Sequence, residues 1–130
     1  MDIYGTWKSI DLGKAPHMLI GGGTGSGKST AVHGFICSLI KHNNANQLRF
    51  IMIDPKRVEL NYYRNLEHLL CPPITDPQTA VAMLDAIADH MDKRYSLLEQ
   101  ETARDIESYN QRSRQKLPYI VVIVDELADL

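Results

Sequence analysis

The chain has 130 residues, of which 44% are hydrophobic and 23% charged, a balance typical of a globular domain rather than of a disordered or fibrous protein. Its net charge of -2 excludes a strongly basic surface over the whole chain, so any nucleic-acid contact must be local or made by other parts of the protein. No apolar run approaches the roughly 20 residues of a membrane span, and the N-terminus lacks a basic region followed by an apolar run. We therefore expect a cytoplasmic segment without direct membrane contact.

Residues 1–130 show no internal repeat and are predicted to form one run of alternating strands and helices. The predicted units are a lead-in at 1–15, a strand-loop-helix unit at 16–42, a second strand and its end at 48–56, helices at 76–112, and a last strand with its following acids at 119–130. Strands separated by helices imply parallel pairing with right-handed crossovers. The fold class is therefore α/β.

The first unit begins with a short apolar run at 17–20, predicted as a strand, which leads into a glycine cluster. After the cluster, apolar residues recur at i, i+3, i+4, i+7 and i+8, which indicates one face of a helix. These residues are Val32, Phe35, Ile36, Leu39 and Ile40. The polar run at 42–44 ends the helix.

Later elements have clear boundary signals. A strand is predicted at 48–53 because the Asp54-Pro55 pair follows it and proline cannot donate to a sheet ladder. Asp76 and Pro77 are predicted to begin the longest helix. The apolar residues at helical spacing in it are Ala80, Leu84, Ile87, Ala88, Met91, Tyr95 and Leu98. Thr102 and Asp105 resemble a capping box that opens a further helix through Tyr109, and the apolar run at 119–124 is predicted as the last strand.

The glycine cluster carries a phosphate-binding motif. Residues 22–29 fit the pattern GxxxxGK[ST] at every fixed position, between a predicted strand and a predicted helix. Glycines admit positive φ, so successive amides can converge on phosphates at a helix N-terminus. We expect Lys28 to reach the β and γ phosphates as a catalytic residue, Ser29 to bind Mg²⁺, and Thr30 to lie near the α phosphate. The expected nucleotide-binding residues are Gly22, Gly23, Thr24, Gly25, Ser26, Gly27, Lys28, Ser29 and Thr30.

Two adjacent acids, Asp125 and Glu126, directly follow the last predicted strand, as in a Walker B motif. Asp125 is expected to hold Mg²⁺, largely through water. Glu126 is expected to polarise or orient the water that attacks the γ phosphate, as a general base. An acid pair after a strand is most often a solvated loop, but the upstream phosphate motif favours the catalytic interpretation. ATP and Mg²⁺ are therefore the predicted cofactors.

Several other residues admit two interpretations. Lys56 and Arg57 follow the second strand on the side where open α/β sheets bind ligands, so a catalytic or subunit-contact role and a solvated basic turn both stay open. Trp7, Tyr62 and Tyr63 are able to stack on a base or nucleotide, although packing is the favoured interpretation. The charged residues at 92–94 and 112–116 are expected on solvated helix faces and ends.

Four segments together resemble the FtsK/SpoIIIE family of DNA translocases. They are residues 16–30, 49–56, 92–95 and 119–129. The combination of Ile-Asp-Pro-Lys at 53–56 with Val-Asp-Glu-Leu-Ala-Asp-Leu at 124–130 is far more specific than either phosphate-site motif alone. Arg104, Tyr109 and Asn110 also match a family element, with Asp105 where that element has Asn.

This resemblance implies a three-layer, RecA-like P-loop fold of the additional-strand type with a mostly parallel sheet, incomplete in this chain. It implies an ATP-driven, typically hexameric ring that moves double-stranded DNA during chromosome segregation, as in cell division, or during mobile-element transfer. In the family, the strand between the Walker A and Walker B strands comes later in the chain, and so do the sensor residue and the arginine supplied to a neighbouring subunit. A membrane anchor is also common in the family.

Two other functions stay open. A secretion ATPase of the same superfamily would move protein instead of DNA. A nucleotide-binding assembly module would use ATP only to hold subunits together. Stimulation of ATP turnover by double-stranded DNA distinguishes the first alternative from a translocase.

Overall fold

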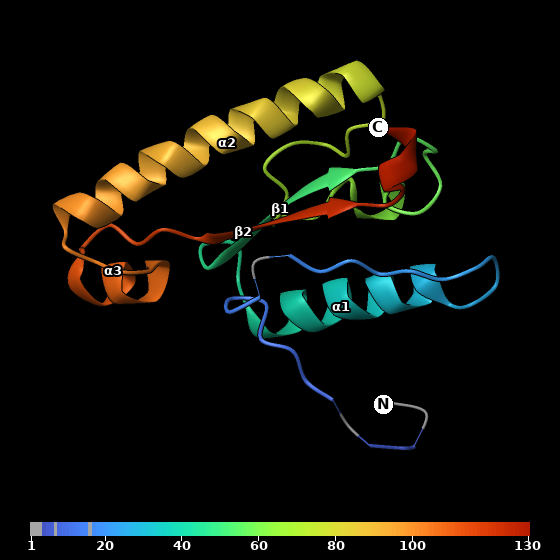
Figure 1. Ribbon diagram of the computed structural model, residues 1–130, viewed down its shortest axis with the longest axis horizontal. Helices are drawn as coiled ribbons and strands as arrows, with labels where there is room; N and C mark the ends of the chain where they lie inside the picture. The colour runs from blue at the N-terminus through green and yellow to red at the C-terminus, as the bar shows by residue number, and fades with distance from the viewer. Residues whose placement is uncertain (1–3, 7, 16) are drawn as a thin grey trace.

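The computed structural model describes residues 4–6, 8–15 and 17–130. Trp7, expected to pack, and residue 16, the predicted start of the strand-loop-helix unit, lie outside the described residues. The helices and strands in chain order are α1 (Lys28–His42), β1 (Leu48–Ile53), η1 (Asn61–Tyr63), α2 (Pro77–Gln100), α3 (Ile106–Arg112), β2 (Tyr119–Val124) and η2 (Leu127–Asp129) (Figure 1). Over the described part of the chain, no helix combines the length and the apolar character needed to cross a membrane.

The two strands form a parallel pair, and both have the predicted bounds. Leu48 lies opposite Tyr119, and the register continues to Ile53 opposite Val124. The chain between them includes α2 and α3, as a crossover between parallel strands requires. The predicted parallel α/β arrangement is therefore confirmed for these two strands.

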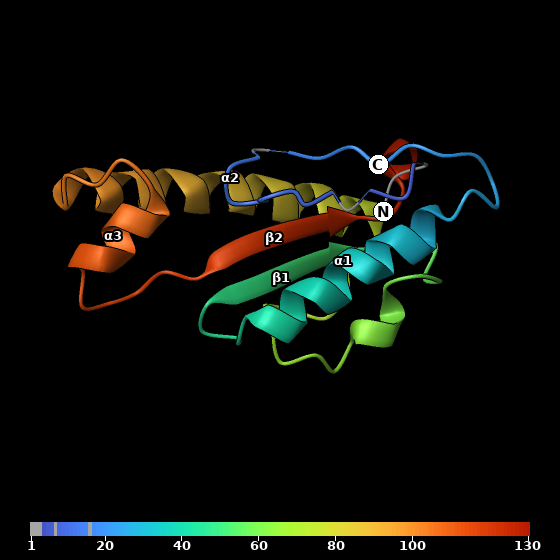
Figure 2. The ribbon, with the colours of Figure 1, turned by 90° about the horizontal axis from the view of Figure 1, so that it is seen from below.

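The sheet lies between two helices, so the fold has three layers. In Figures 1 and 2, α1 covers one face of the sheet and α2 the other. Alternate β1 residues point to opposite faces because the side-chain period of a strand is two. Phe50 and Met52 pack with Ile36 of α1, whereas Ile51 and Ile53 pack with Ala80 of α2. A strand with both faces covered explains why β1 is apolar at nearly every position.

The outer edge of β1, away from β2, is covered by residues 68–74. The Phe50 amide donates to the His68 carbonyl at 2.8 Å, and the Leu70 amide donates back to Phe50 at 3.0 Å. Further along, the Ile74 amide donates to Met52 at 2.8 Å, and the Asp54 amide donates to Ile74 at 2.8 Å. The backbone of β1 is therefore hydrogen-bonded along both edges.

The strand predicted at 17–20 does not form. The described residues contain a sheet of two strands, in the order β1-β2, and residues 17–20 belong to neither. A strand exists only when a neighbour completes its hydrogen bonds. No such neighbour is present for residues 17–20 among the described residues, so an apolar run alone was not sufficient to predict pairing.

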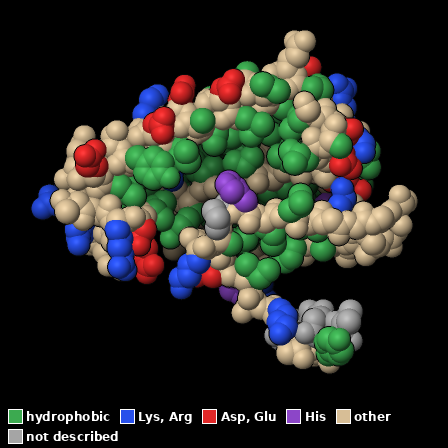
Figure 3. Space-filling view, in the orientation of Figure 1, with side chains coloured by type: hydrophobic (Ala, Val, Ile, Leu, Met, Phe, Trp, Pro, Cys, Tyr) green, Lys and Arg blue, Asp and Glu red, His purple; other side chains and the backbone are tan. Residues whose placement is uncertain are grey.

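The apolar faces predicted for the helices are only partly buried. Ile36 is fully buried, but Phe35 is 40% exposed. On α2, Ala80 is buried near the start of the helix, whereas Met91 and Tyr95 are 48% and 60% exposed. The reason is visible in Figure 1, where α2 continues well past the two strands that it covers. Figure 3 shows apolar side chains gathered over the middle of the visible face.

The third helix begins later than predicted. Asp105, not Thr102, is the N-cap: its carboxylate accepts a hydrogen bond from the Ser108 amide at 2.7 Å, and the Ser108 hydroxyl completes the capping box. Thr102 has a φ of 51°, in the left-handed region, whereas an N-cap residue takes the extended conformation that Asp105 adopts. The helix then runs to Arg112 instead of ending at Tyr109.

Two side chains fix the start of β2. Arg94 of α2, expected on a solvated face, is partly buried and donates to the Pro118 carbonyl at 2.8 Å, and this burial lowers the pKa of its guanidinium. Asn110 accepts from the Leu117 amide at 2.7 Å and donates to the Leu117 carbonyl at 2.8 Å. These contacts hold the last strand in register with β1, and with it the acids that follow.

Candidate nucleotide site

The loop before α1 is built for close approach of a ligand to its backbone. Gly25 and Gly27 have φ of 78° and 90°, in the region where side chains other than glycine are strained. Gly27 is the N-cap of α1, and no side chain caps this helix. The first-turn amides of a helix have no intrahelical partner. At the start of α1 they stay available to an anion such as a phosphate.

Glycine is also needed at the start of the loop. A Cβ atom built on Gly22 would lie 2.2 Å from the Ser26 hydroxyl oxygen. The loop closes at this point because the Ser26 amide donates to the Gly23 carbonyl at 3.0 Å. The predicted nucleotide-binding residues therefore form one continuous turn, in which residues 22–27 and Thr30 are exposed and only Lys28 and Ser29 are partly buried.

The structure brings Lys28 to the acid pair that follows β2. Its Nζ donates to the Asp125 carbonyl oxygen at 3.1 Å and lies 3.6 Å from Glu126 Oε2. The Asp125 amide donates to the Ile53 carbonyl at 3.0 Å, which continues the β1-β2 ladder by one residue and fixes the acids beside the loop. Ser29 and Thr30 lie in the first turn of α1, where Ser29 is partly buried and Thr30 is exposed.

The Asp125 carboxyl lies in unfavourable surroundings for a negative charge. Burial is the main cause that raises its pKa, and the charges of Asp54, Glu59 and Glu126 raise it further. Lys28 acts in the opposite direction. A divalent cation would stabilise a carboxylate placed among other acids, and Mg²⁺ needs only one or two protein ligands when phosphates and water supply the rest. Asp125 is therefore a donor of the type that Mg²⁺ takes, with phosphates and water expected to supply the rest.

The segment after β1, residues 54–60, here called the β1-exit turn, contains Lys56 and Arg57, which the sequence singled out, and also Asp54 and Glu59, which it did not. Asp54 has no exposed surface, and its Oδ2 accepts from the Glu59 amide at 3.0 Å and the Leu60 amide at 2.9 Å. Its Oδ1 is buried and has no hydrogen-bond partner in the described part of the chain. The Asp54-Pro55 pair was a sequence signal for the end of β1 and part of the family resemblance, but neither use assigned a role to the Asp54 carboxylate.

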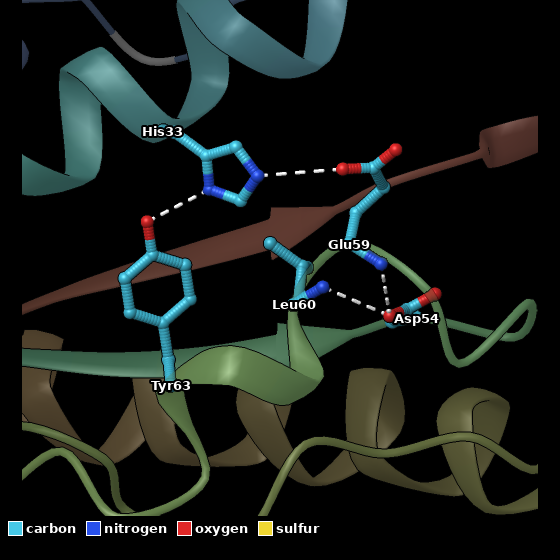
Figure 4. A network of polar contacts seen from close by, with 5 residues as sticks. All are labelled: His33, Asp54, Glu59, Leu60 and Tyr63. Carbon is cyan, nitrogen blue, oxygen red and sulfur yellow. Dashed lines mark hydrogen bonds and ion pairs between the residues drawn. The ribbon is translucent and has the colours of Figure 1, made fainter.

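His33 of α1 joins the β1-exit turn to the helix that follows the phosphate loop (Figure 4). Its Nε2 lies 3.3 Å from Glu59 Oε2, and its Nδ1 lies 2.8 Å from the Tyr63 hydroxyl. The sequence showed no ligand spacing for His33, because its partners come from another element. Tyr63 is thus partly buried, whereas Tyr62, also expected to pack, is 83% exposed.

Lys56, in the β1-exit turn, contacts two of the acidic residues that follow β2. Its Nζ lies 3.6 Å from Glu126 Oε2 and 3.3 Å from Asp129 Oδ2. The hydrogen bond and charge of Asp129, followed by those of Glu126, raise the pKa of the Lys56 ammonium. Two lysines from different loops therefore meet one carboxylate. Arg57, the next residue, is exposed and has a φ of 60°.

Comparison with known proteins gives a consistent result. A family model described as the FtsK/SpoIIIE family matches residues 1–115. The protein named DNA translocase FtsK in Helicobacter pylori strain J99 is 46% identical over 133 aligned positions, which cover 99% of this chain and 16% of that protein. The one of the same name in Staphylococcus epidermidis strain RP62A is 45% identical, with coverage of 99% and 17%. The chain spans about one sixth of the length of these relatives.

Two solved structures share the fold. The pCW3 conjugation coupling protein TcpA, in a monomer form with ATPγS, matches with a TM-score of 0.78 and 33% identity, covering 92% of this chain and 32% of that one. The cytoplasmic domain of EssC matches with a TM-score of 0.71 and 26% identity, covering 79% and 20%.

Proposed function

This chain belongs to the FtsK/SpoIIIE family, and from that membership we propose that it is part of a motor that hydrolyses ATP to move double-stranded DNA. The observation that carries the proposal is the meeting of Lys28, from the glycine-rich loop, with Asp125 and Glu126 after β2. Residues nearly one hundred positions apart thus combine a phosphate-binding helix start with an acid pair at the end of a strand.

In this proposal each residue has one task. The open amides at the start of α1 bind the phosphates, and Lys28 neutralises charge on the β and γ phosphates. Ser29 and Asp125 hold Mg²⁺, which stabilises charge on the phosphoryl oxygens when bound. Glu126 orients the attacking water and accepts its proton. The remaining residues of the phosphate loop, 22–27 and Thr30, shape the cradle.

The DNA substrate is supported by the relatives, which are named DNA translocases, and by TcpA, which is named a conjugation coupling protein. We propose that the motor acts in the cytoplasm as a hexameric ring, in chromosome segregation or mobile-element transfer. A protein-exporting motor and a nucleotide-binding assembly module are the alternatives. The first would hydrolyse ATP without a response to DNA, and the second would bind ATP without turnover.

The test is ATP turnover by the intact protein with and without double-stranded DNA, for wild type and Glu126→Gln. We expect DNA to stimulate the wild type, and Glu126→Gln to bind ATP but to hydrolyse it about a hundredfold or more slowly, because the general base is gone. Glu99→Gln, an exposed glutamate on α2, is the matched control. Turnover that ignores DNA would favour the protein-exporting motor, and binding without wild-type turnover would favour the assembly module.

A further inference from the structure

The β1-exit turn is a rigid support. The Arg57 amide donates to the Asp54 carbonyl at 3.1 Å, which closes a four-residue turn with Pro55 in its second position, where the fixed φ of proline is favoured. The buried Asp54 carboxylate holds the last two residues of the β1-exit turn through the amides of Glu59 and Leu60. Lys56, which lies between these anchors, therefore projects from a fixed backbone.

This support is attached to the helix that carries the phosphate loop. Glu59 pairs with His33 of α1, and His33 also contacts the Tyr63 hydroxyl, so α1, the β1-exit turn and η1 are joined by side chains that are only partly exposed (Figure 4). Two sets of contacts thus hold the β1-exit turn: those of Asp54 within the turn and those of His33 with α1. Together they fix the position of Lys56 relative to Lys28, at the start of α1.

Lys56 contacts both ends of η2. Glu126 directly precedes this short helix and Asp129 ends it, and the Lys56 ammonium lies 3.6 Å and 3.3 Å from their carboxylates. Glu126 Oε2 is also 3.6 Å from Lys28. If Lys28 turns to the phosphates of bound ATP, its contact with Glu126 is weakened. Lys56 then stays as the cation that restrains this carboxylate, since its second anchor is Asp129 and not a residue of the phosphate loop.

We propose that Lys56 is a positioning residue for Glu126: it holds one carboxylate oxygen, Oε2, so that the other is directed to the attacking water. This inference rests on the proposed function, in which Glu126 is the general base. It assigns the conspicuous lysine after β1 to the hydrolysis step in its own subunit rather than to a solvated turn or a subunit contact.

The experiment compares Lys56→Ala, Lys56→Arg and Lys41→Ala in the intact protein, with kcat and KM for ATP and the affinity for a fluorescent ATP analogue as readouts. Lys41 is an exposed lysine in the last turn of α1 and serves as the matched control. We expect Lys56→Ala to lower kcat about tenfold, a part of the hundredfold or more that a general base supplies, while KM and affinity change less than about twofold. Lys56→Arg should restore most of kcat, because it keeps the cation.

A second variant, Asp129→Asn, removes the anchor but leaves both lysines and Glu126 in place. It should lower kcat in the same direction by a smaller factor, and its effect should nearly vanish in a Lys56→Ala background. Equal kcat in Lys56→Ala and Lys41→Ala would overturn the inference, and so would a loss confined to nucleotide affinity. Failure of the proposed function looks different: the wild type itself would not hydrolyse ATP, or Glu126→Gln would match it, and the inference would then fall with its premise.

Discussion

The N-termini of α1 and α2 differ in whether a side chain accepts the hydrogen bonds of their first-turn amides. At α2, the Asp76 carboxylate accepts hydrogen bonds from the Thr79 amide and the Thr79 hydroxyl, both at 2.7 Å. At α1, the N-cap is Gly27, which has no side chain to offer. The first-turn amides of α2 are thus satisfied by a side chain, whereas those of α1 stay open at the place where we propose that phosphates bind.

The β1-exit turn contains a buried example of amides that are satisfied by a carboxylate. There the buried carboxylate of Asp54 satisfies the amides of Glu59 and Leu60, as Asp76 does at the surface. Carboxylate-satisfied amides and open amides therefore lie on neighbouring loops around the same acid pair. Substitutions at the two kinds of loop should affect different properties of the protein.

The largest effect is expected at the open helix start. Lys28→Ala removes the cation that accompanies the free amides of α1, so ATP turnover should fall about a hundredfold or more, the range seen when one charge-stabilising donor is lost. A steady-state ATPase assay on the intact protein measures this, with Lys41→Ala as the control. Undiminished turnover in Lys28→Ala would remove α1 from the catalytic site.

In the β1-exit turn, whose amides are satisfied by the Asp54 carboxylate, a substitution should change the stability of the fold rather than ATP turnover directly. Asp54→Ala leaves the amides of Glu59 and Leu60 without their acceptor, and each buried unsatisfied donor costs roughly 1–3 kcal/mol, so we expect a loss of about 3 kcal/mol in the free energy of unfolding. Denaturant unfolding followed by circular dichroism measures it. Asp85→Ala, an exposed acid on α2, should leave the unfolding midpoint nearly unchanged. Comparable midpoints for the two variants would mean that the turn is not held by Asp54.

Substitutions of Gly27 and Gly34 test the backbone conformation at the start of α1 against that within the helix. Gly27→Ala places a side chain at a φ of 90° and should destabilise the protein by about 1–2 kcal/mol. Gly34→Ala, within α1 and with nothing within 4 Å of the added methyl, should stabilise it by about 0.5–1 kcal/mol. Thermal unfolding of both variants gives the two signs, and shifts of the same sign would contradict the assigned backbone of the loop.

The smallest effect is expected at Asp76. Its hydrogen bonds with Thr79 lower the pKa of the Asp76 carboxyl, so the ionised cap is favoured in the folded state. Its contribution is fully present above the unfolded pKa of about 3.9 and is lost as the pH falls through the lower folded value. Asp76→Ala should therefore lower the unfolding temperature more at about pH 7 than at about pH 3. A shift that is independent of pH would show that the cap acts without its charge.

The sequence was sufficient where a boundary or a motif is local. β1 and β2 were predicted with the correct ends because proline-containing stops or acids bound their apolar runs, and α2 was placed by the Asp76-Pro77 pair. The phosphate loop was predicted from the spacing of its motif, and the acid pair from its place after the last strand together with that motif. The structure brings Lys28 to that pair.

The sequence was insufficient where the structure of a segment depends on contacts with another element. Residues 17–20 have the composition of a strand but no neighbour to pair with among the described residues. The capping box moved from Thr102 to Asp105 because local dihedrals, not residue type, select the N-cap. The contacts of His33 with Glu59 and of Lys56 with Glu126 join separate elements, and no periodicity in the chain encodes them.

Residues 68–74 cover the outer edge of β1, so a further strand cannot pair with the sheet on that side. This segment occupies the outer hydrogen-bonding groups of Phe50 and Met52, and it contains Pro72 and Pro73, which have no amide hydrogen for a further strand. β1 is thereby sealed against edge-to-edge association, the route by which exposed strands recruit other chains. Any additional strand must therefore join beside β2, the strand that precedes Asp125 and Glu126, so a strand that widens the sheet would lie next to this acid pair.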